Sequence, residues 1–220
     1  MKRRKKIITV AIDSPAAAGA GTQAKLIANE YNLLYLDTGK IYRLIGELNL
    51  NQKKFNYKLV KKKINLINLA KLNKKSLLTD KVAVSASIVA KDLKIRKIVK
   101  NFQIRCAYNP PKKFFGSVLD GRDITSVIMK DAMFKFYFTA SIKVRAKRRY
   151  KEFKNLKKNI TYKEVLKSIR NRDKMDKNRL HSPLKKTKDS ILINTSKLSK
   201  KACFLKIKAI MDKKILNGNI

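Results

Sequence analysis

The segment ITVAIDSPAAAGAGTQAKLIA, residues 8–28, combines an apolar run, a loop of small residues and a helical pattern. Its first residues, Ile8–Ile12, are apolar and mostly β-branched, which is typical of a buried strand. Small residues follow, and a helical pattern begins at Thr22. A strand, a small-residue loop and a helix N-terminus together predict a phosphate-binding site, because backbone N–H groups converge there and the helix dipole favours an anion.

Two departures of this loop from the full phosphate-loop pattern, G-x-x-x-x-G-K-[ST], concern its first glycine and its lysine. Ser14 stands at the first glycine, Gly19 at the second and Ala20 at the lysine. A serine is tolerated at the first position if the backbone needs no positive φ there. Ala20 is the more serious change, because the lysine normally reaches the transferring phosphate. The stretch therefore predicts a phosphate loop that lacks its own cation.

Length and composition indicate one globular domain. The chain has 220 residues, of which 44% are hydrophobic. No stretch is long and apolar enough to cross a membrane, and the basic residues Met1–Lys6 precede only a short apolar run, so we expect a cytoplasmic protein rather than a secreted one. Cys106 and Cys203 have no metal-binding spacing and are expected to be reduced thiols in the core.

The charge balance is extreme, with 55 basic against 15 acidic residues and a net charge of +40. One interpretation is nucleic-acid binding. The other is an enrichment in lysine spread over solvated faces. We favour the second, because the excess is distributed and nearly all lysine, whereas base readout favours the two-pronged arginine side chain. Such a field still attracts phosphorylated ligands and binds RNA without specificity.

Arginine is scarce beside lysine, so its positions are informative. An arginine holds a phosphate or a planar base edge with two parallel hydrogen bonds, which lysine cannot do. At any single position an ordinary surface cation is the alternative interpretation. Beyond Arg3 and Arg4, the chain has Arg43, Arg96, Arg105, Arg122, Arg145, Arg148, Arg149, Arg170, Arg172 and Arg179.

A βαβ pattern opens the chain. A helix is expected over 22–31, and the apolar run 33–36 is expected to form a second buried strand. The sequence Asp-Thr-Gly at 37–39 predicts a turn before a helix at about 40–50. This order implies a parallel sheet, with Arg43 near the carboxyl end of a strand, where such sheets bind ligands.

The rest of the chain divides into an insert and a second run of strands. Residues 51–80 have apolar residues at helical spacing, which predicts one or two amphipathic helices in an inserted subdomain. A helix follows at about 95–108 and ends before Pro110 and Pro111. Further expected elements are strands at 114–119, 134–138 and 190–193 and a last helix at about 199–216.

The strand at 114–119 runs into Asp120-Gly121-Arg122-Asp123. An acid at the tip of a buried strand beside a phosphate loop is the expected place to hold Mg²⁺ or its waters. A β-turn with solvated charges is the alternative interpretation. We favour the functional one because the segment follows an apolar strand.

Two basic helices are expected between the last two strands. Ser141 caps the first, and Thr161 with Glu164 forms a capping-box pattern at the start of the second, which runs to about Asp176. Both helices carry arginines and are joined by a basic break at 154–159. This arrangement is typical of a lid that closes over phosphates and excludes water.

These motifs resemble those of the bacterial cytidylate kinases, the CMP and dCMP members of the nucleoside monophosphate kinases. The resemblance covers most of the chain and rests on four segments in order: residues 12–22, 36–43, 120–123 and 172–179. It implies an α/β P-loop nucleoside monophosphate kinase fold with a five-stranded parallel sheet flanked by helices. It also implies one domain over 1–220, with its core at 6–45, 95–150 and 188–216, an NMP-binding insert at about 46–94 and a lid at about 150–180.

The resemblance implies transfer of the ATP γ-phosphoryl group to CMP or dCMP by direct in-line displacement, with Mg²⁺ entering as the ATP complex. From the sequence itself we expect no membrane association, only non-specific contact with nucleic acid through the high positive charge, and a monomer. A catalytically weakened kinase-fold protein, a basic RNA-binding protein and a nucleoside monophosphate kinase for another base are the alternatives.

The resemblance also assigns the site residues. The ATP-binding residues would be Ser14, Pro15, Ala16, Ala17, Ala18, Gly19, Ala20, Gly21, Thr22, Arg148 and Arg149. The CMP-binding residues would be Thr38, Arg43, Ser87, Arg96, Arg122, Asp123, Arg172, Asp176 and Arg179. The catalytic residues would be Arg122, Arg172 and Asp120. No side chain is implied as a direct metal ligand, and Thr22 and Asp120 are the candidates that would meet the Mg²⁺ carried by ATP.

Three explanations compete for Ala20. Another cation, such as Lys25, Lys40 or a lid arginine, could take over the lysine's role; the enzyme could be slow; or catalysis could be lost while nucleotide binding remains. We favour a working enzyme, because loss of catalysis should relax the acceptor site and its residues are all present in the sequence.

Overall fold

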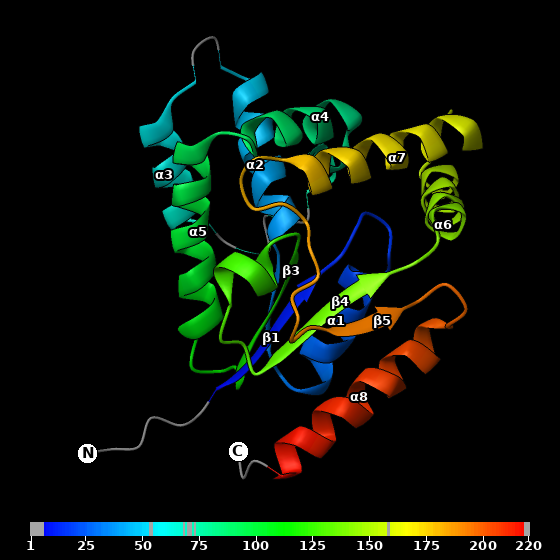
Figure 1. Cartoon of the computed structure of the whole chain (residues 1–220). Helices are drawn as coiled ribbons and strands as arrows, with labels where there is room; N and C mark the ends of the chain where they lie inside the picture. Colours follow the sequence, from blue (N-terminus) through cyan, green and yellow to red (C-terminus); the bar gives the residue numbers. More distant parts are fainter. Residues whose placement is uncertain are drawn as a thin grey trace.

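Five parallel strands form a single sheet at the centre of the molecule (Figure 1) in the order β2-β3-β1-β4-β5. The strands are β1 Ile8–Asp13, β2 Leu34–Asp37, β3 Gly116–Gly121, β4 Phe134–Thr139 and β5 Ile191–Asn194. Because the chain moves from β1 to one edge and later returns to the other, the strand order reverses beside β1, and open α/β sheets bind ligands at such a point. The predicted five-stranded parallel sheet is confirmed.

The structure, a computed structural model, describes residues 7–52, 55–67, 69, 72, 74–157 and 159–217. The basic stretch Met1–Lys6 lies outside the described residues, as does position 158 in the predicted break between the two basic helices. Within the described ranges, no helix is long and apolar enough to cross a membrane.

Eight α-helices are described in these ranges. They are α1 Ala20–Glu30, α2 Thr38–Leu50, α3 Tyr57–Asn65, α4 Asp80–Val89, α5 Leu93–Tyr108, α6 Ile142–Asn155, α7 Tyr162–Asn178 and α8 Lys200–Asn217. Of the one or two helices predicted over 51–80, α3 is confirmed. A short 3-10 turn follows at Lys75–Leu78, and α4 begins only at Asp80, the last residue of that range.

Alternation along β1 divides the core into two layers. Val10 and Ile12 face the cluster that includes Ile27 of α1 and Ile207 of α8, whereas Ala11 faces the cluster built by α2, α3, α4 and α5. Successive strand residues point to opposite faces, so a buried central strand is apolar on both. The helices therefore cover both faces of the sheet (Figure 1), and the strand ends remain for the loops that build a site.

The helices α6 and α7 have a small core of their own. Ala146 and Phe153 of α6 pack with Val165 and Ile169 of α7 in a cluster separate from the two sheet layers. Both predicted caps at their N-termini are confirmed: Ser141 accepts from the N–H of Val144 at 3.4 Å, and Thr161 with Glu164 forms the capping box. This paired unit extends beyond the carboxyl ends of the strands (Figure 1).

Two predicted elements, the second helix and the third strand, have wrong boundaries. Residues 37–39 form no separate turn, because α2 begins at Thr38 and the Asp37 carboxylate caps it by accepting from the N–H of Lys40 at 3.3 Å. The third strand begins at Gly116, where a Cβ would lie 1.8 Å from the Ile8 carbonyl oxygen, so only glycine allows β3 to approach β1 there. That strand then continues through Gly121, which places Asp120 inside the sheet instead of in a turn.

Candidate active site

The phosphate loop leaves β1 after Asp13 and enters α1 at Ala20. Its backbone is left-handed at two positions, Ala17 with φ 60° and Gly19 with φ 91°. Ser14 has no positive φ, so the condition for replacing glycine there is met. Gly19 supplies no side-chain cap, which leaves the first N–H groups of α1 to an incoming anion.

Three elements hold this loop in place. The Ser14 N–H donates to the Gly121 carbonyl at 3.2 Å, which joins the loop to β3. Arg145 of α6 donates through Nη1 to the Ala16 carbonyl at 3.2 Å. Thr195, just after β5, donates through Oγ1 to the Ala18 carbonyl at 2.8 Å. These bonds fix the loop in the absence of a lysine side chain.

The three arginines of α6 differ in how their charges are compensated. Arg145 is buried and makes two hydrogen bonds to Asp173, at 3.0 and 2.5 Å, so its charge is paired. Arg149 pairs with Glu152 at 2.9 Å. Arg148 instead donates to Thr195, at 2.9 Å to Oγ1 and 2.7 Å to the carbonyl, and has no carboxylate partner among the described residues.

The unpaired charge of Arg148 lies beside the loop. Its Nη1 atom is 3.8 Å from the point that a Cβ on Gly19 would occupy. Ala20, at the lysine position, is 4% exposed and its methyl group packs in the apolar layer under α1. Lys25 lies on the exposed side of α1, and Lys40 lies in the first turn of α2, where its charge lowers the pKa of Asp120.

Asp120 is a half-buried residue near the end of β3, and part of its carboxylate is shielded from solvent. Burial, with repulsion from Asp37, raises its pKa to about 8, against the lowering effects of the Tyr35 hydroxyl and neighbouring cations. Its Oδ1 atom has no hydrogen-bond partner among the described residues, although it is fully buried. A buried oxygen without a partner is costly, so it indicates a place for a missing donor or cation. Its other oxygen faces Gly21, at 3.4 Å from a Cβ built there.

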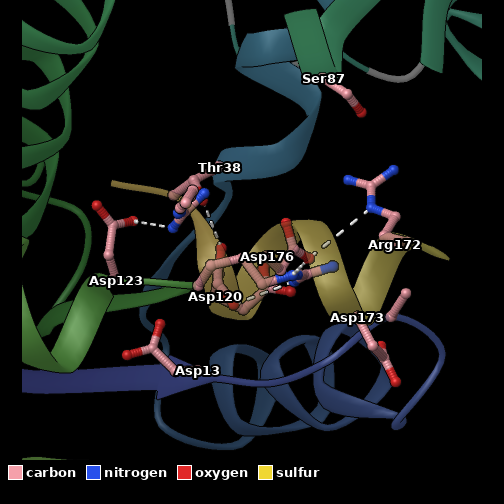
Figure 2. Close-up of polar contacts among 12 residues, drawn as sticks. Asp13, Thr38, Ser87, Asp120, Asp123, Arg172, Asp173 and Asp176 are labelled. Carbon is pink, nitrogen blue, oxygen red and sulfur yellow. Dashed lines mark hydrogen bonds and ion pairs between the residues drawn. The ribbon is translucent and has the colours of Figure 1, made fainter. Parts of the chain in front are cut away.

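One arginine–aspartate cluster, Arg122, Arg172 and Asp176, joins the end of β3 to α7 (Figure 2). Arg122 donates through Nε to Asp176 at 2.7 Å, and Arg172 lies 3.9 Å from the same carboxylate. Burial lowers the pKa of Arg172 to about 10, and repulsion from Arg122 adds to this effect. Two guanidinium groups share one carboxylate, so the cluster carries a net positive charge in a partly desolvated place, which favours a bound anion.

A second cluster consists of Arg96, Asp123 and Arg179. Arg96 of α5 donates to Asp123 at 2.5 Å and also to the Ala90 carbonyl at 3.2 Å. Arg179, directly after α7, lies 3.9 Å from the same carboxylate, and its Nη2 atom has no hydrogen-bond partner among the described residues. Burial lowers the pKa of Arg179, and Arg96 adds to this by repulsion. The cluster presents one carboxylate and planar donors, which suits recognition of a base edge.

Comparison with known proteins identifies the protein family of this chain. A model of the family described as cytidylate kinase matches residues 10–213. The cytidylate kinase of Clostridium botulinum (strain Hall) is 39% identical over 215 residues, covering 94% of this chain and 98% of that protein. The chain belongs to the cytidylate kinase family. Another member, from Mesorhizobium japonicum, is 37% identical and covers 97% of this chain and 98% of its own.

The fold of this cytidylate kinase family member also occurs in solved structures. The crystal structure of an uncharacterized protein from Eubacterium ventriosum superposes with a TM-score of 0.56 at 19% identity, covering 93% of this chain and 98% of that one. At that identity the likeness concerns the fold alone. It agrees with the P-loop nucleoside monophosphate kinase fold predicted from the motifs.

Most of the predicted site residues lie close to one another in the structure. The two clusters and Thr38, whose Oγ1 donates to the Asp120 carbonyl at 2.8 Å, meet at the carboxyl ends of β1, β2 and β3. Arg43 donates to the Leu77 carbonyl at 2.7 Å, yet its charge also lowers the pKa of Arg172. Ser87 stands apart on its own helix (Figure 2) and donates to the Ala83 carbonyl at 3.0 Å.

Asp13 is a further residue of the site to which the sequence motifs assigned no role. It is fully buried at the end of β1 and accepts hydrogen bonds from the N–H groups of Ile124 and Thr125, each at 2.8 Å. The Thr125 hydroxyl adds a third bond at 2.6 Å. The one available signal was an acidic residue within an otherwise apolar strand. Its partners 111 and 112 residues further along could not be predicted.

Proposed function

We propose that this member of the cytidylate kinase family transfers the ATP γ-phosphoryl group to CMP, with dCMP as a second acceptor. The activity itself follows from membership in the family. The observation that carries the acceptor assignment is the pair of arginine–aspartate clusters beside the phosphate loop. One cluster suits a phosphate and the other suits a base with both donor and acceptor groups on its edge.

On the donor side, the loop 14–22 would hold the ATP phosphates with its backbone N–H groups. The helix dipole of α1 favours the negative charge, and the left-handed residues Ala17 and Gly19 shape the turn. Arg148 and Arg149 would reach the nucleotide from α6. We further propose that Arg148 supplies the positive charge that the lysine position lacks, because its charge has no carboxylate partner among the described residues.

On the acceptor side, Arg122, Arg172, Arg43 and Thr38 would bind the CMP phosphate. Asp123 would accept from the exocyclic amine of cytosine, while arginines and Ser87 would donate to its ring nitrogen and carbonyl. Uracil presents an oxygen where cytosine presents that amine, so a carboxylate there would repel it. Sites built to hydrogen-bond one group reject an analogue that lacks it.

Magnesium fits the site at Asp120. The partnerless Oδ1 of this residue is an oxygen of the type that Mg²⁺ and its waters prefer, and Thr22 lies in the first turn of α1. When bound with ATP, the ion neutralises charge on the phosphate oxygens. Asp120 must be ionised to take part, and a nearby cation favours the ionised form by lowering the pKa.

The remaining chemistry is alignment and charge neutralisation. The acceptor is already an anion, so in-line transfer needs no strong base and no covalent intermediate. The arginines of both clusters would keep two negative phosphates close together. We propose that residues at about 150–180, the end of α6 together with α7, form the lid that excludes water. We also propose that residues at about 46–94 form the CMP-binding insert and that one chain acts as a cytoplasmic monomer.

An acceptor panel tests the substrate assignment. Purified chain with MgATP should convert CMP with kcat/KM at least about tenfold above UMP, AMP and GMP, because one mismatched hydrogen-bonding group costs about 1.4 kcal/mol or more. ADP release coupled to a reporter gives the rates, and chromatography identifies CDP. Equal rates with UMP would contradict the role of Asp123, and a preference for AMP or GMP would contradict the assignment as a whole.

The role of Arg148 is testable with a double-mutant cycle. Arg148→Gln should lower kcat about a hundredfold in the natural chain, but less than about tenfold in an Ala20→Lys background, because the restored lysine takes over the charge. Lys147→Gln is the matched control, since it removes one exposed charge from the same helix. Equal losses of kcat in both backgrounds would show that Arg148 does not replace the lysine. The same comparison with Lys40→Gln would then test whether Lys40 supplies the missing charge.

A further inference from the structure

Asp13 stands between the two halves of the proposed site. It is the last residue of β1, directly before the phosphate loop, and its register partner across the sheet is Gly121 of β3. Figure 2 shows its carboxylate pointing toward the turn that follows Asp123. Both of its oxygens are engaged there: Oδ1 accepts from the Ile124 N–H, and Oδ2 accepts from the N–H and the hydroxyl of Thr125.

These bonds come from a short π-helical turn, Ile124–Ile128. The turn begins one residue after Asp123, which pairs with Arg96, and two residues after Arg122, which pairs with Asp176. Asp13 therefore anchors the backbone that carries one member of each cluster. The ion pairs of Arg122 and Asp123 lie in the two clusters that form the proposed CMP site, whereas Asp13 is fully buried beneath them.

Burying the Asp13 carboxylate at this position costs free energy that a purely structural contact would not require. Burial raises its pKa to about 6, and the hydrogen bonds from Thr125 and Ile124 offset only part of that cost. No cation pairs with it among the described residues, so its partners are neutral donors. Both oxygens must accept at once, which neither asparagine nor leucine can do.

We propose that Asp13 is a positioning residue that fixes the acceptor-binding segment 122–125 to the end of the phosphate-loop strand, and so aligns the CMP phosphate with ATP. The inference rests on the proposed function, CMP phosphorylation. The phosphate loop has its own anchors in the Ser14 N–H, Arg145 and Thr195. Loss of Asp13 therefore loosens the acceptor segment more than the donor loop.

Steady-state kinetics of the full chain test this role. Asp13→Asn should raise the KM for CMP about tenfold and the KM for ATP less than about threefold, because one oxygen is replaced by an NH₂ group that faces a backbone N–H. Thr125→Val removes the hydroxyl bond alone and should change the KM for CMP in the same direction by about threefold, whereas Thr125→Ser should behave like the natural chain.

Ser117→Ala is the matched control for general destabilisation. Ser117 is also fully buried and donates to the Ala107 carbonyl at 2.7 Å, but on the amino-terminal half of β3, away from both clusters. It should lower Tm and leave both KM values unchanged. If Asp13→Asn fails to fold, the KM for CMP of Thr125→Val is compared with that of Thr125→Ser, and equal values would contradict the positioning role.

Two outcomes would overturn the positioning role. One is a loss of Tm with both KM values unchanged, and the other is an equal rise in both. Absence of CMP turnover in the natural chain would contradict the proposed function instead. Calorimetric titration with CMP then still tests Asp13, because the positioning role predicts about tenfold weaker CMP binding by Asp13→Asn.

Discussion

Replacing Arg122 by glutamine should lower kcat/KM for CMP about a thousandfold or more, because in the proposed site this arginine supplies a preorganised charge where the two phosphates would meet. Burial by itself lowers the pKa of Arg122, but the charge and the hydrogen bond of Asp176 outweigh it and raise that pKa, so the guanidinium is always charged. Among the described residues, the substitution also leaves Asp176 with only the longer ion pair to Arg172, at 3.9 Å. Initial rates over a range of CMP concentrations measure the effect.

Two further variants control for this result. Arg122→Lys keeps the charge but cannot donate to Asp176 and to the Gly121 carbonyl with the same planar group, so it should recover only part of the lost rate. Arg105→Gln removes an exposed arginine from α5 and should leave the rate unchanged. A rate for Arg122→Gln within about threefold of the natural chain would contradict a role for Arg122 in transition-state stabilisation.

Asp120→Asn should have opposite effects on activity and stability. We expect kcat to fall about a hundredfold, because a carboxylate that can face the Mg²⁺ of ATP is lost. The free energy of unfolding at pH 8 should rise on the order of a few kcal/mol, because a buried charge is costly and asparagine is neutral. Kinetic assays and thermal melts without nucleotide or Mg²⁺ measure the two effects separately.

The stability gain from Asp120→Asn should depend on pH. The pKa of Asp120 in the folded chain is about 8, above its usual value of 3.8. Between these values the native carboxyl keeps its proton and the unfolded carboxyl has lost it, so the natural chain loses stability as pH rises from about 4 to about 8. Asparagine does not titrate, so the difference in Tm should be small at pH 5 and largest above pH 8. A constant difference would contradict the burial of this charge.

The sheet was predictable because its signals are local. Ile8–Ile12 and the aromatic run of β4 are apolar segments of strand length, and Ser141 and Thr161 are side chains with capping chemistry. The boundaries that failed depend on distant contacts. Gly116 starts β3 because of the Ile8 carbonyl on another strand, and a residue-by-residue pattern contains no such information.

The site was predictable where a side chain is itself the functional group. Arg96, Arg122 and Arg179 were singled out because the chain otherwise uses lysine, and the structure places them around two aspartates. Asp13 was missed because its importance lies in backbone N–H groups 111 and 112 residues away. The uncompensated charge of Arg148 was equally hidden, because it depends on which neighbouring arginines have carboxylate partners.

We propose that a phosphate loop with alanine at the lysine position still supports phosphoryl transfer to CMP. The most direct measurement is the steady-state turnover of the full chain with saturating MgATP and CMP, beside Arg122→Gln purified in the same way to reveal contaminating kinase. We expect turnover of about 1 s⁻¹ or more for the natural chain, within the usual range for kinases, and at least about a hundredfold less for the variant. Equal rates in both preparations, or CMP binding without turnover, would contradict it.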